Sequence, residues 1–340
     1  MKKAKRISII LLTLIIAFSM IACQSADPAT SGEGDAEETT FALKVGCMQA
    51  DSHSSVLAFQ KFKEDVEAAS EGRVTVEIYS NAVLGDEAAM QEMMGMGTLD
   101  MMYTGHLPVL IPLLGALELP YLFEDRDHIL AFHETDAFKE LMAPLAEYNM
   151  EVVAAFENGF RQITNDKKPI NSASDLKGML FRTAPTPGEL FAFEAAGAVA
   201  TTIAYTELYS ALQQGVVDGQ ENPIQNIYSA KFYEVQKYLA VTNHIYNSGF
   251  VTIRKDLYDS MPEDIRGIVY DCIKDAQDWQ INYVADNDSR MLEEIEAYGV
   301  EVTYPDVAEM EEAMSGAYER MYEEYPEAEE LVAAIRALVE

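Results

Sequence analysis

The stretch FALKVGCMQADSHSSVLAFQKFKEDVEAASEGRVTVEIY (residues 41–79) contains the pattern that decides the fold class. Its two ends, 41–48 and 73–79, are rich in apolar and β-branched residues and are predicted to be strands. Between them, residues 54–69 have the apolar spacing of an amphipathic helix. A strand, a helix and a second strand in this order are typical of an α/β protein with parallel strands.

The same alternation continues along the chain. Residues 87–96 and 126–148 are predicted to be helical, the second with a break near Pro144, and residues 99–103 are predicted to be extended. Residues 150–165 are expected to run as a strand into a loop and out again. Together these patterns predict an α/β architecture with mainly parallel strand pairing.

The longest helical pattern runs from Pro262 to Tyr298, with Gly267 as its only glycine. A continuous helix of this length would measure about 55 Å at 1.5 Å per residue, which is longer than one domain. The residues themselves allow either a helix that spans two domains or a helix that breaks. The chain is then expected to end in an extended segment and two acidic amphipathic helices.

The charge balance excludes one class of partner. The 340 residues carry 24 Lys and Arg against 57 Asp and Glu, a net charge of −33. Nucleic acid is therefore not the expected partner, because affinity for a polyphosphate comes mainly from clustered cations. An apolar share of 49% indicates a core-forming protein. The length favours two domains, since single cores stop growing at roughly 250–300 residues.

The N-terminus has the features of an export signal. The basic residues MKKAKR precede an apolar run, Ile7–Phe18, that is too short for a bilayer needing about 20 residues. The run ends in Met20-Ile21-Ala22-Cys23, which resembles a bacterial lipobox. We therefore predict a lipoprotein signal peptide over residues 1–22 and lipidation of Cys23, with an ordinary cleaved signal as the alternative.

Residues 23–40 are predicted to be a flexible tether, because residues 24–40 contain no large apolar side chain. Removing residues 1–22 leaves 20 cations against 57 acids, a net charge of −37. The protein is thus expected outside the cytoplasmic membrane, lipid-anchored to it. Cys47 and Cys272 are expected to be buried thiols, with a disulfide between them as the alternative.

Catalytic and metal-binding motifs are missing. The chain has no Gly-rich phosphate loop, GxSxG, HExxH or CxxC, and its five histidines are scattered. Neither an enzyme, a cofactor nor a metal site is therefore predicted.

Arginine is scarce, with nine residues after position 22, and two of them stand out. Arg161 and Arg182 are predicted to follow apolar strands in loop-adjacent positions. A guanidinium group can bind a carboxylate through two parallel hydrogen bonds, which a lysine ammonium cannot reproduce. The pair is a candidate site for an organic anion, and pairing with surface acids is the alternative.

Four stretches carry a resemblance to a known family. They are LELPYLFED (117–125), GFRQITNDKKPINSASDLKGMLFR (159–182), TELYSALQQGVVDGQENP (206–223) and KFYEVQKYLAVTNH (231–244). From about residue 41 onward, the chain resembles the DctP-type solute-binding proteins of tripartite ATP-independent periplasmic (TRAP) transporters.

The resemblance implies a periplasmic binding protein-like fold, in which two α/β domains close a hinge cleft on an organic acid. Residues 262–298 would then form a long helix that spans both domains. Domain I would comprise residues 41–158 and 248–287, and domain II residues 159–247 and 288–340.

The resemblance also implies site residues. Arg182 would be the main carboxylate clamp, Arg161 a second cation, Asn222 a polar contact and Tyr205 an aromatic surface under the ligand. Polar side chains near the expected cleft are candidates for hydroxyl contacts, although each is also explained by loop capping: Gln49, Ser52, His53, Tyr103 and His106.

Departures from the family pattern limit the choice of ligand. The sialic acid receptors carry an acid and an Arg where this chain has Gly105 and Pro108, and an Asn after the clamp where it has Thr183-Ala184-Pro185. Sialate is therefore disfavoured. A sugar acid such as a hexuronate or aldonate is favoured over a four-carbon dicarboxylate.

The expected function is capture without catalysis, with delivery of the anion to membrane permease subunits. The alternative is an extracytoplasmic sensor that presents the same closed form to a signalling partner.

Overall fold

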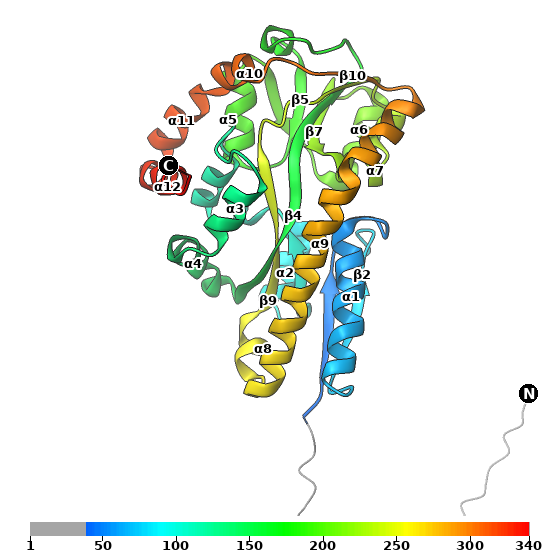
Figure 1. The fold of residues 1–340 in the computed structure, drawn as a ribbon, viewed down its shortest axis with the longest axis vertical. Helices are drawn as coiled ribbons and strands as arrows, with labels where there is room; N and C mark the ends of the chain where they lie inside the picture. Colours follow the sequence, from blue (N-terminus) through cyan, green and yellow to red (C-terminus); the bar gives the residue numbers. More distant parts are fainter. Residues whose placement is uncertain (1–38, 340) are drawn as a thin grey trace, which may run out of the picture. The chain divides into compact units, whose positions relative to one another are not determined.

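The computed structural model describes residues 39–339 and is built around a mixed β-sheet (Figure 1). The strands are β1 (Phe41–Gly46), β2 (Val74–Tyr79), β3 (Met101–Thr104), β4 (Met150–Asn165), β5 (Leu180–Thr183), β6 (Val199–Thr202), β7 (Gly219–Pro223), β8 (Tyr238–Ala240), β9 (Tyr246–Arg254) and β10 (Glu301–Thr303).

Helices flank the strands along the whole described chain. They are α1 (Ser54–Ala69), α2 (Glu87–Gly95), α3 (Arg126–His133), α4 (Asp136–Met142), α5 (Pro187–Ala195), α6 (Tyr205–Gln214), α7 (Ile224–Ser229), α8 (Lys255–Ser260), α9 (Glu263–Tyr298), α10 (Val307–Met314), α11 (Gly316–Glu324) and α12 (Glu327–Arg336). Within residues 39–339, no helix is both long and apolar enough to cross a membrane.

The predicted signal peptide, Cys23 and nearly all of the predicted tether lie outside the described residues. Cys47 and Cys272 are both free and buried, as expected for thiols rather than a disulfide.

The sheet has the strand order β2-β1-β3-β9-β4-β7-β5-β6, and its centre differs from its two ends. Strands β1–β3 with α1 and α2 form a first lobe, in which the strands pair in parallel. Strands β5–β7 with α5–α7 form a second lobe, also parallel. At the centre, β9 pairs antiparallel with both β3 and β4, and β4 pairs antiparallel with β7. The prediction of mainly parallel pairing is therefore wrong at the centre, because β4 carries the chain to the second lobe and β9 returns it.

Strand β4 is one continuous element, so the loop predicted within residues 150–165 is absent. Register shifts interrupt its pairing with β9 at Val152/Ala154 and Glu157/Gly159. Gly159 has a φ of +106°, a conformation that side-chain-bearing residues rarely adopt. Asn158 and Gly159 therefore do not form a turn. They lie at an irregular point of the β4–β9 pairing, where the register shifts.

Helix α9 is also continuous, which settles the open question about residues 262–298. It follows Pro262 and ends at Gly299, whose φ is +116°. Its first half, including Ile265, Val269 and Ile273, belongs to the core around α1 and β1, and its later residues Met291 and Ile295 to the core around α6 and α7. The helix thus packs on both lobes, as Figure 1 shows.

Between these two cores, glutamines of α9 bind the edge of β4 that has no neighbouring strand. The backbone N–H of Ala155 donates to Gln277 Oε1 at 2.9 Å, and that of Glu157 donates to Gln280 Oε1 at 2.8 Å. Backbone donors that would otherwise be unsatisfied are paired in this way.

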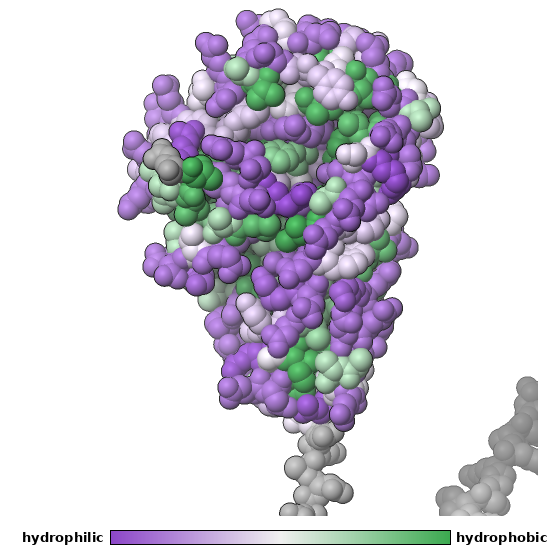
Figure 2. Space-filling model, in the orientation of Figure 1, coloured by the Kyte–Doolittle hydropathy of each residue, from purple (hydrophilic) through white to green (hydrophobic). Residues whose placement is uncertain are grey.

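Smaller differences from the sequence predictions occur elsewhere. The segment 126–148 breaks already between α3 and α4, where Thr135 caps the second helix through Phe138 N. The chain ends in three helices, α10–α12, rather than two. Hydrophilic residues cover most of the face shown in Figure 2, in keeping with the acidic composition.

Gly188, in the first turn of α5, offers a test of the packing between α5 and the 3₁₀ segment Pro112–Glu118. A Cβ atom there would lie 2.5 Å from Gly115 O and 2.6 Å from Glu118 O, so the backbone would have to move. We expect Gly188→Ala to lower the free energy of unfolding by about 1–3 kcal/mol, measured by urea denaturation. Gly267→Ala is the control, because nothing lies within 4 Å of that site on α9, and it should stabilise by about 0.5–1 kcal/mol. Equal melting of the two variants would contradict the packing argument.

Candidate ligand-binding site

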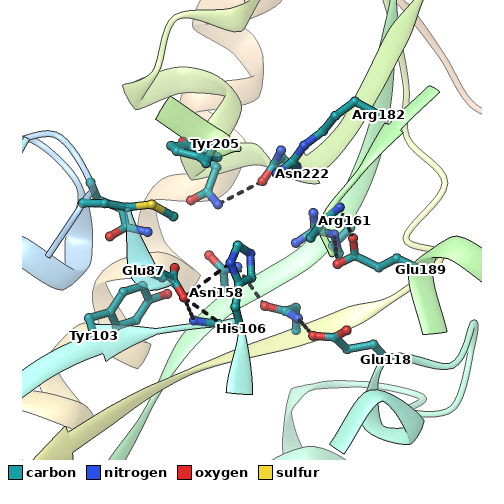
Figure 3. Close-up of a pocket in the computed structure, with 16 residues that line it drawn as sticks. Glu87, Tyr103, His106, Glu118, Asn158, Arg161, Arg182, Glu189, Tyr205 and Asn222 are labelled. Atoms are coloured by element: carbon teal, nitrogen blue, oxygen red, sulfur yellow. Dashed lines mark hydrogen bonds and ion pairs between the residues drawn. The ribbon is translucent and has the colours of Figure 1, made fainter. Parts of the chain in front are cut away.

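A cavity between the two lobes brings together most of the residues predicted to bind a ligand. It has about 390 Å³ of space between its lining atoms, part of which is open to solvent. The predicted residues that line it are Gln49, Tyr103, His106, Arg161, Arg182, Tyr205 and Asn222. Figure 3 shows side chains from both lobes and from the central strands around this space.

Arg182 is a buried cation with an unused donor. It lies within β5 rather than after the strand, and only 1% of it is exposed. Its Nε donates to Ile203 O at 2.9 Å, while its Nη2 is buried without a hydrogen-bond partner in residues 39–339. Burial lowers the pKa of the guanidinium group, although nearby carboxylates oppose this effect. A buried charge without a hydrogen-bonded partner is costly, so this group favours an anion in the cavity.

Arg161 is also buried and lies within β4, not in a loop. Unlike Arg182, it is already bound by carboxylates. Nη2 donates to Glu221 Oε1 at 2.7 Å, Nε donates to Glu221 Oε2, and Nε lies 3.2 Å from Glu189 Oε1. A ligand would therefore meet Arg161 through Nη1, because Nε and Nη2 are engaged.

Four buried glutamates surround these arginines. Burial raises the pKa of Glu118 to about 7 and holds that of Glu189 well above its usual value. For Glu221 the effect of burial is outweighed by Arg161 and His244, which lower its pKa to about 2. Oε2 of Glu87 accepts hydrogen bonds from the Thr104 hydroxyl and from the backbone N–H groups of Gly105 and His106. Burial thus favours the uncharged forms of Glu118 and Glu189, whereas Glu221 stays ionised beside Arg161.

The polar and aromatic residues of the prediction occupy different positions on the wall. Asn222, on β7, donates through Nδ2 to Gln220 Oε1 and accepts from Asn226 Nδ2 at 3.1 Å. Tyr205 is the first residue of α6, and its ring packs edge-on against Phe232 with ring centroids 5.6 Å apart. The Tyr103 hydroxyl is buried and has no hydrogen-bond partner among the residues that the structure describes, so it can bind a ligand.

Two predicted residues lie away from the cavity lining. His53 is buried behind the wall, where Nδ1 lies 2.8 Å from Ser55 Oγ and Nε2 lies 2.6 Å from Asn226 Oδ1. Burial lowers its pKa to about 4, so the ring is neutral at physiological pH. Ser52 is exposed. His53 therefore links α1 of the first lobe to α7 of the second instead of facing the cavity.

Several lining residues were missed by sequence reasoning: Met48, Glu87, Glu118, Asn158, Glu189, Asn226 and Asn247. The glutamates could not be distinguished among 57 acidic residues. For Glu118, one feature of the sequence could have indicated burial: it is an acid among the apolar residues of the LELPYLFED stretch.

Comparison with known proteins identifies the class. Residues 45–325 match the family DctP, described as bacterial extracellular solute-binding protein, family 7. The sialic acid-binding periplasmic protein SiaP of Vibrio cholerae is 32% identical over 322 residues, covering 94% of this chain and 94% of that protein.

Two solved TRAP periplasmic solute-binding proteins have the same fold. One, from Polaromonas sp. JS666 and bound to D-erythronate, is 30% identical with a TM-score of 0.83, covering 88% of this chain and 98% of the other. Another, from Sulfurospirillum deleyianum with bound succinate, is 26% identical with a TM-score of 0.83, covering 88% and 99%.

The chain therefore belongs to the DctP family of solute-binding proteins, in the TRAP transporter class. The predicted family and the two-domain α/β fold with a long helix are confirmed. Members of this family are periplasmic substrate-binding receptors rather than enzymes, which confirms the prediction that the chain is not an enzyme. The exact domain boundaries stay a prediction.

The raised pKa of Glu118 predicts a pH-dependent stability. Because the folded state holds this proton more tightly than the unfolded chain, the stabilisation is complete below about pH 4.5 and is lost as the pH rises through about 7. Relative to Glu118→Gln, the wild-type free energy of unfolding should fall by up to about 3 kcal/mol over this window in urea titrations. Asp288, whose pKa burial also raises to about 7, is present in both proteins and cancels in the difference. An unchanged difference between pH 5 and pH 8 would contradict the assignment.

Proposed function

We propose that this protein is the extracytoplasmic receptor of a TRAP transporter, which captures a small organic acid anion between its lobes and delivers it to membrane permease subunits. The observation that carries the proposal is the unpaired Nη2 of Arg182, buried in a cavity lined by both lobes. The ligand carboxylate would bind this guanidinium group.

Contacts across the cavity support closure of the lobes around the ligand. His53 Nε2 lies 2.6 Å from Asn226 Oδ1, and the Ser54 hydroxyl donates to Gln225 Oε1 at 2.5 Å. Both pairs join the start of α1 to α7. A ligand shifts an open–closed equilibrium only by its differential affinity for the two states, and only the closed state offers these contacts together with Arg182 and Tyr103.

Within this function, a sugar acid such as a hexuronate or aldonate is the favoured ligand and a four-carbon dicarboxylate the alternative. Two arginines line the cavity, and of these Arg161 is paired with carboxylates whereas Arg182 is not. The cavity therefore offers one unpaired cation, which matches one ligand carboxylate. A second carboxylate would lie against the carboxyl groups of Glu87, Glu118 and Glu189, which line the same cavity. The relatives that bind D-erythronate and succinate show that the fold accommodates either class.

Removal of the Arg182 guanidinium group, which can donate two parallel hydrogen bonds to a carboxylate, tests the proposal. Isothermal titration calorimetry with a panel of uronates, aldonates and dicarboxylates should find at least one acid whose affinity falls about 100-fold or more in Arg182→Ala. Arg182→Lys should also bind weakly, because charge alone does not supply two parallel hydrogen bonds. Arg290→Ala, on the exposed face of α9, is the control and should bind as the wild type does. No Arg182-dependent binding of any acid would overturn the proposed function.

We further propose that Cys23 carries a lipid that holds the receptor at the membrane, as the Met20-Ile21-Ala22-Cys23 sequence indicates. Replacement Cys23→Ser should then move the exported protein from the membrane fraction to the soluble fraction on cell fractionation. Retention of the variant in the membrane fraction would contradict lipid anchoring.

A further inference from the structure

Three residues from three elements form a directional chain of hydrogen bonds along one side of the cavity. Asn158, on β4, donates through Nδ2 to Asn247 Oδ1 at 2.8 Å, and Asn247, on β9, donates through Nδ2 to Glu118 Oε1 at 2.9 Å. Glu118 closes the 3₁₀ segment Pro112–Glu118. All three line the cavity, and Figure 3 shows Glu118 and Asn158 on the same side of it.

Because each hydrogen bond in this series points from Asn158 towards Glu118, the atoms left unpaired are acceptors and not donors. Glu118 Oε2 and Asn158 Oδ1 are both buried without a hydrogen-bond partner in residues 39–339. The Thr186 hydroxyl lies close enough to Glu118 to favour its charged form, but it completes no hydrogen bond of its own. Buried acceptors without partners cost free energy, so an occupant that donates hydrogen bonds here is favoured.

Unpaired donors line the same cavity. Arg182 Nη2 and the Tyr103 hydroxyl are buried without partners in the described chain. The cavity thus presents donors that suit a carboxylate and acceptors that suit hydroxyl groups.

We propose that Glu118 and Asn158 form a subsite that binds ligand hydroxyl groups, so that the protein prefers a hydroxylated monocarboxylate to a dicarboxylate. This inference rests on the proposed function, because it assumes that the first carboxylate binds Arg182. A second carboxylate would leave both acceptors without donors and would place like charges together in a site shielded from water. A ligand hydroxyl at the same place would donate to Glu118 Oε2 or Asn158 Oδ1.

A series of four-carbon acids varies the polar groups beyond the first carboxylate. D-erythronate carries hydroxyls, succinate a second carboxylate, butyrate neither, and 4-aminobutyrate an ammonium group. Calorimetry at pH 8, where Glu118 is ionised, should give D-erythronate an affinity about 10-fold or more above that of succinate. Galactonate and galactarate, which differ only in the hydroxymethyl or carboxylate group at the last carbon, form a matched pair for a longer ligand.

The variant Glu118→Gln tests the residue itself. It keeps the shape of the side chain but removes the charge, so the preference for each hydroxy acid over its diacid should shrink to about 3-fold or less. Glu140→Gln, which removes the same charge from the exposed end of α4, is the matched control and should keep the wild-type ratios.

Three outcomes would overturn the inference while the receptor function stands. They are acids that bind through Arg182 without preference for the monocarboxylate of either pair, ratios that Glu118→Gln leaves unchanged, and tightest binding of 4-aminobutyrate. Absence of any Arg182-dependent binding would instead overturn the proposed function itself.

Discussion

The burial of two guanidinium groups in the middle of a sheet is the constraint on which the site depends. Arg161 and Arg182 both lie within strands, so neither can turn its head group to water. Arg161 is neutralised by Glu221 across the β4–β7 pairing, and this ion pair fixes the floor of the cavity. Arg182 keeps an unpaired donor. The two cations thus differ: Arg161 is paired within the protein, whereas Arg182 has a donor left over for a group in the cavity.

The central elements explain how one cavity can be assembled from distant parts of the sequence. Strands β4 and β9 pass from lobe to lobe in opposite directions, and α9 follows them on the outside with its ends in separate cores. The lobes are connected by these long, regular elements, by a shared hydrophobic cluster and by side-chain hydrogen bonds between α1 and α7. Arg161 and Asn158 on β4 and Asn247 on β9 therefore lie where the lobes meet, independently of the loops.

Much of this organisation could be predicted from the sequence, and the failures have physical causes. The α/β class, the long helix and seven cavity residues follow from periodicity and from the family resemblance. The prediction of a loop within β4 was wrong because the strand continues through Asn158-Gly159 with only a register shift. Pairing with β9 on both sides of this shift keeps the segment extended. His53 was misplaced because a histidine near a cleft can equally bond to the opposite lobe, as it does to Asn226. Glu118 was missed because its position among the apolar residues of LELPYLFED does not show that it faces the cavity, which only the tertiary structure reveals.

The glutamines of α9 that cover β4 have a further consequence for the association of this protein with other chains. A strand with an uncovered edge is a template for pairing with other chains, and bending at a hinge would be expected to expose one. Here the N–H groups of Ala155 and Glu157 donate to the buried amides of Gln277 and Gln280, and Gln280 is itself held by Ser54 Oγ and Glu157 O. These two backbone donors are therefore satisfied within the fold and cannot pair with a strand of another molecule.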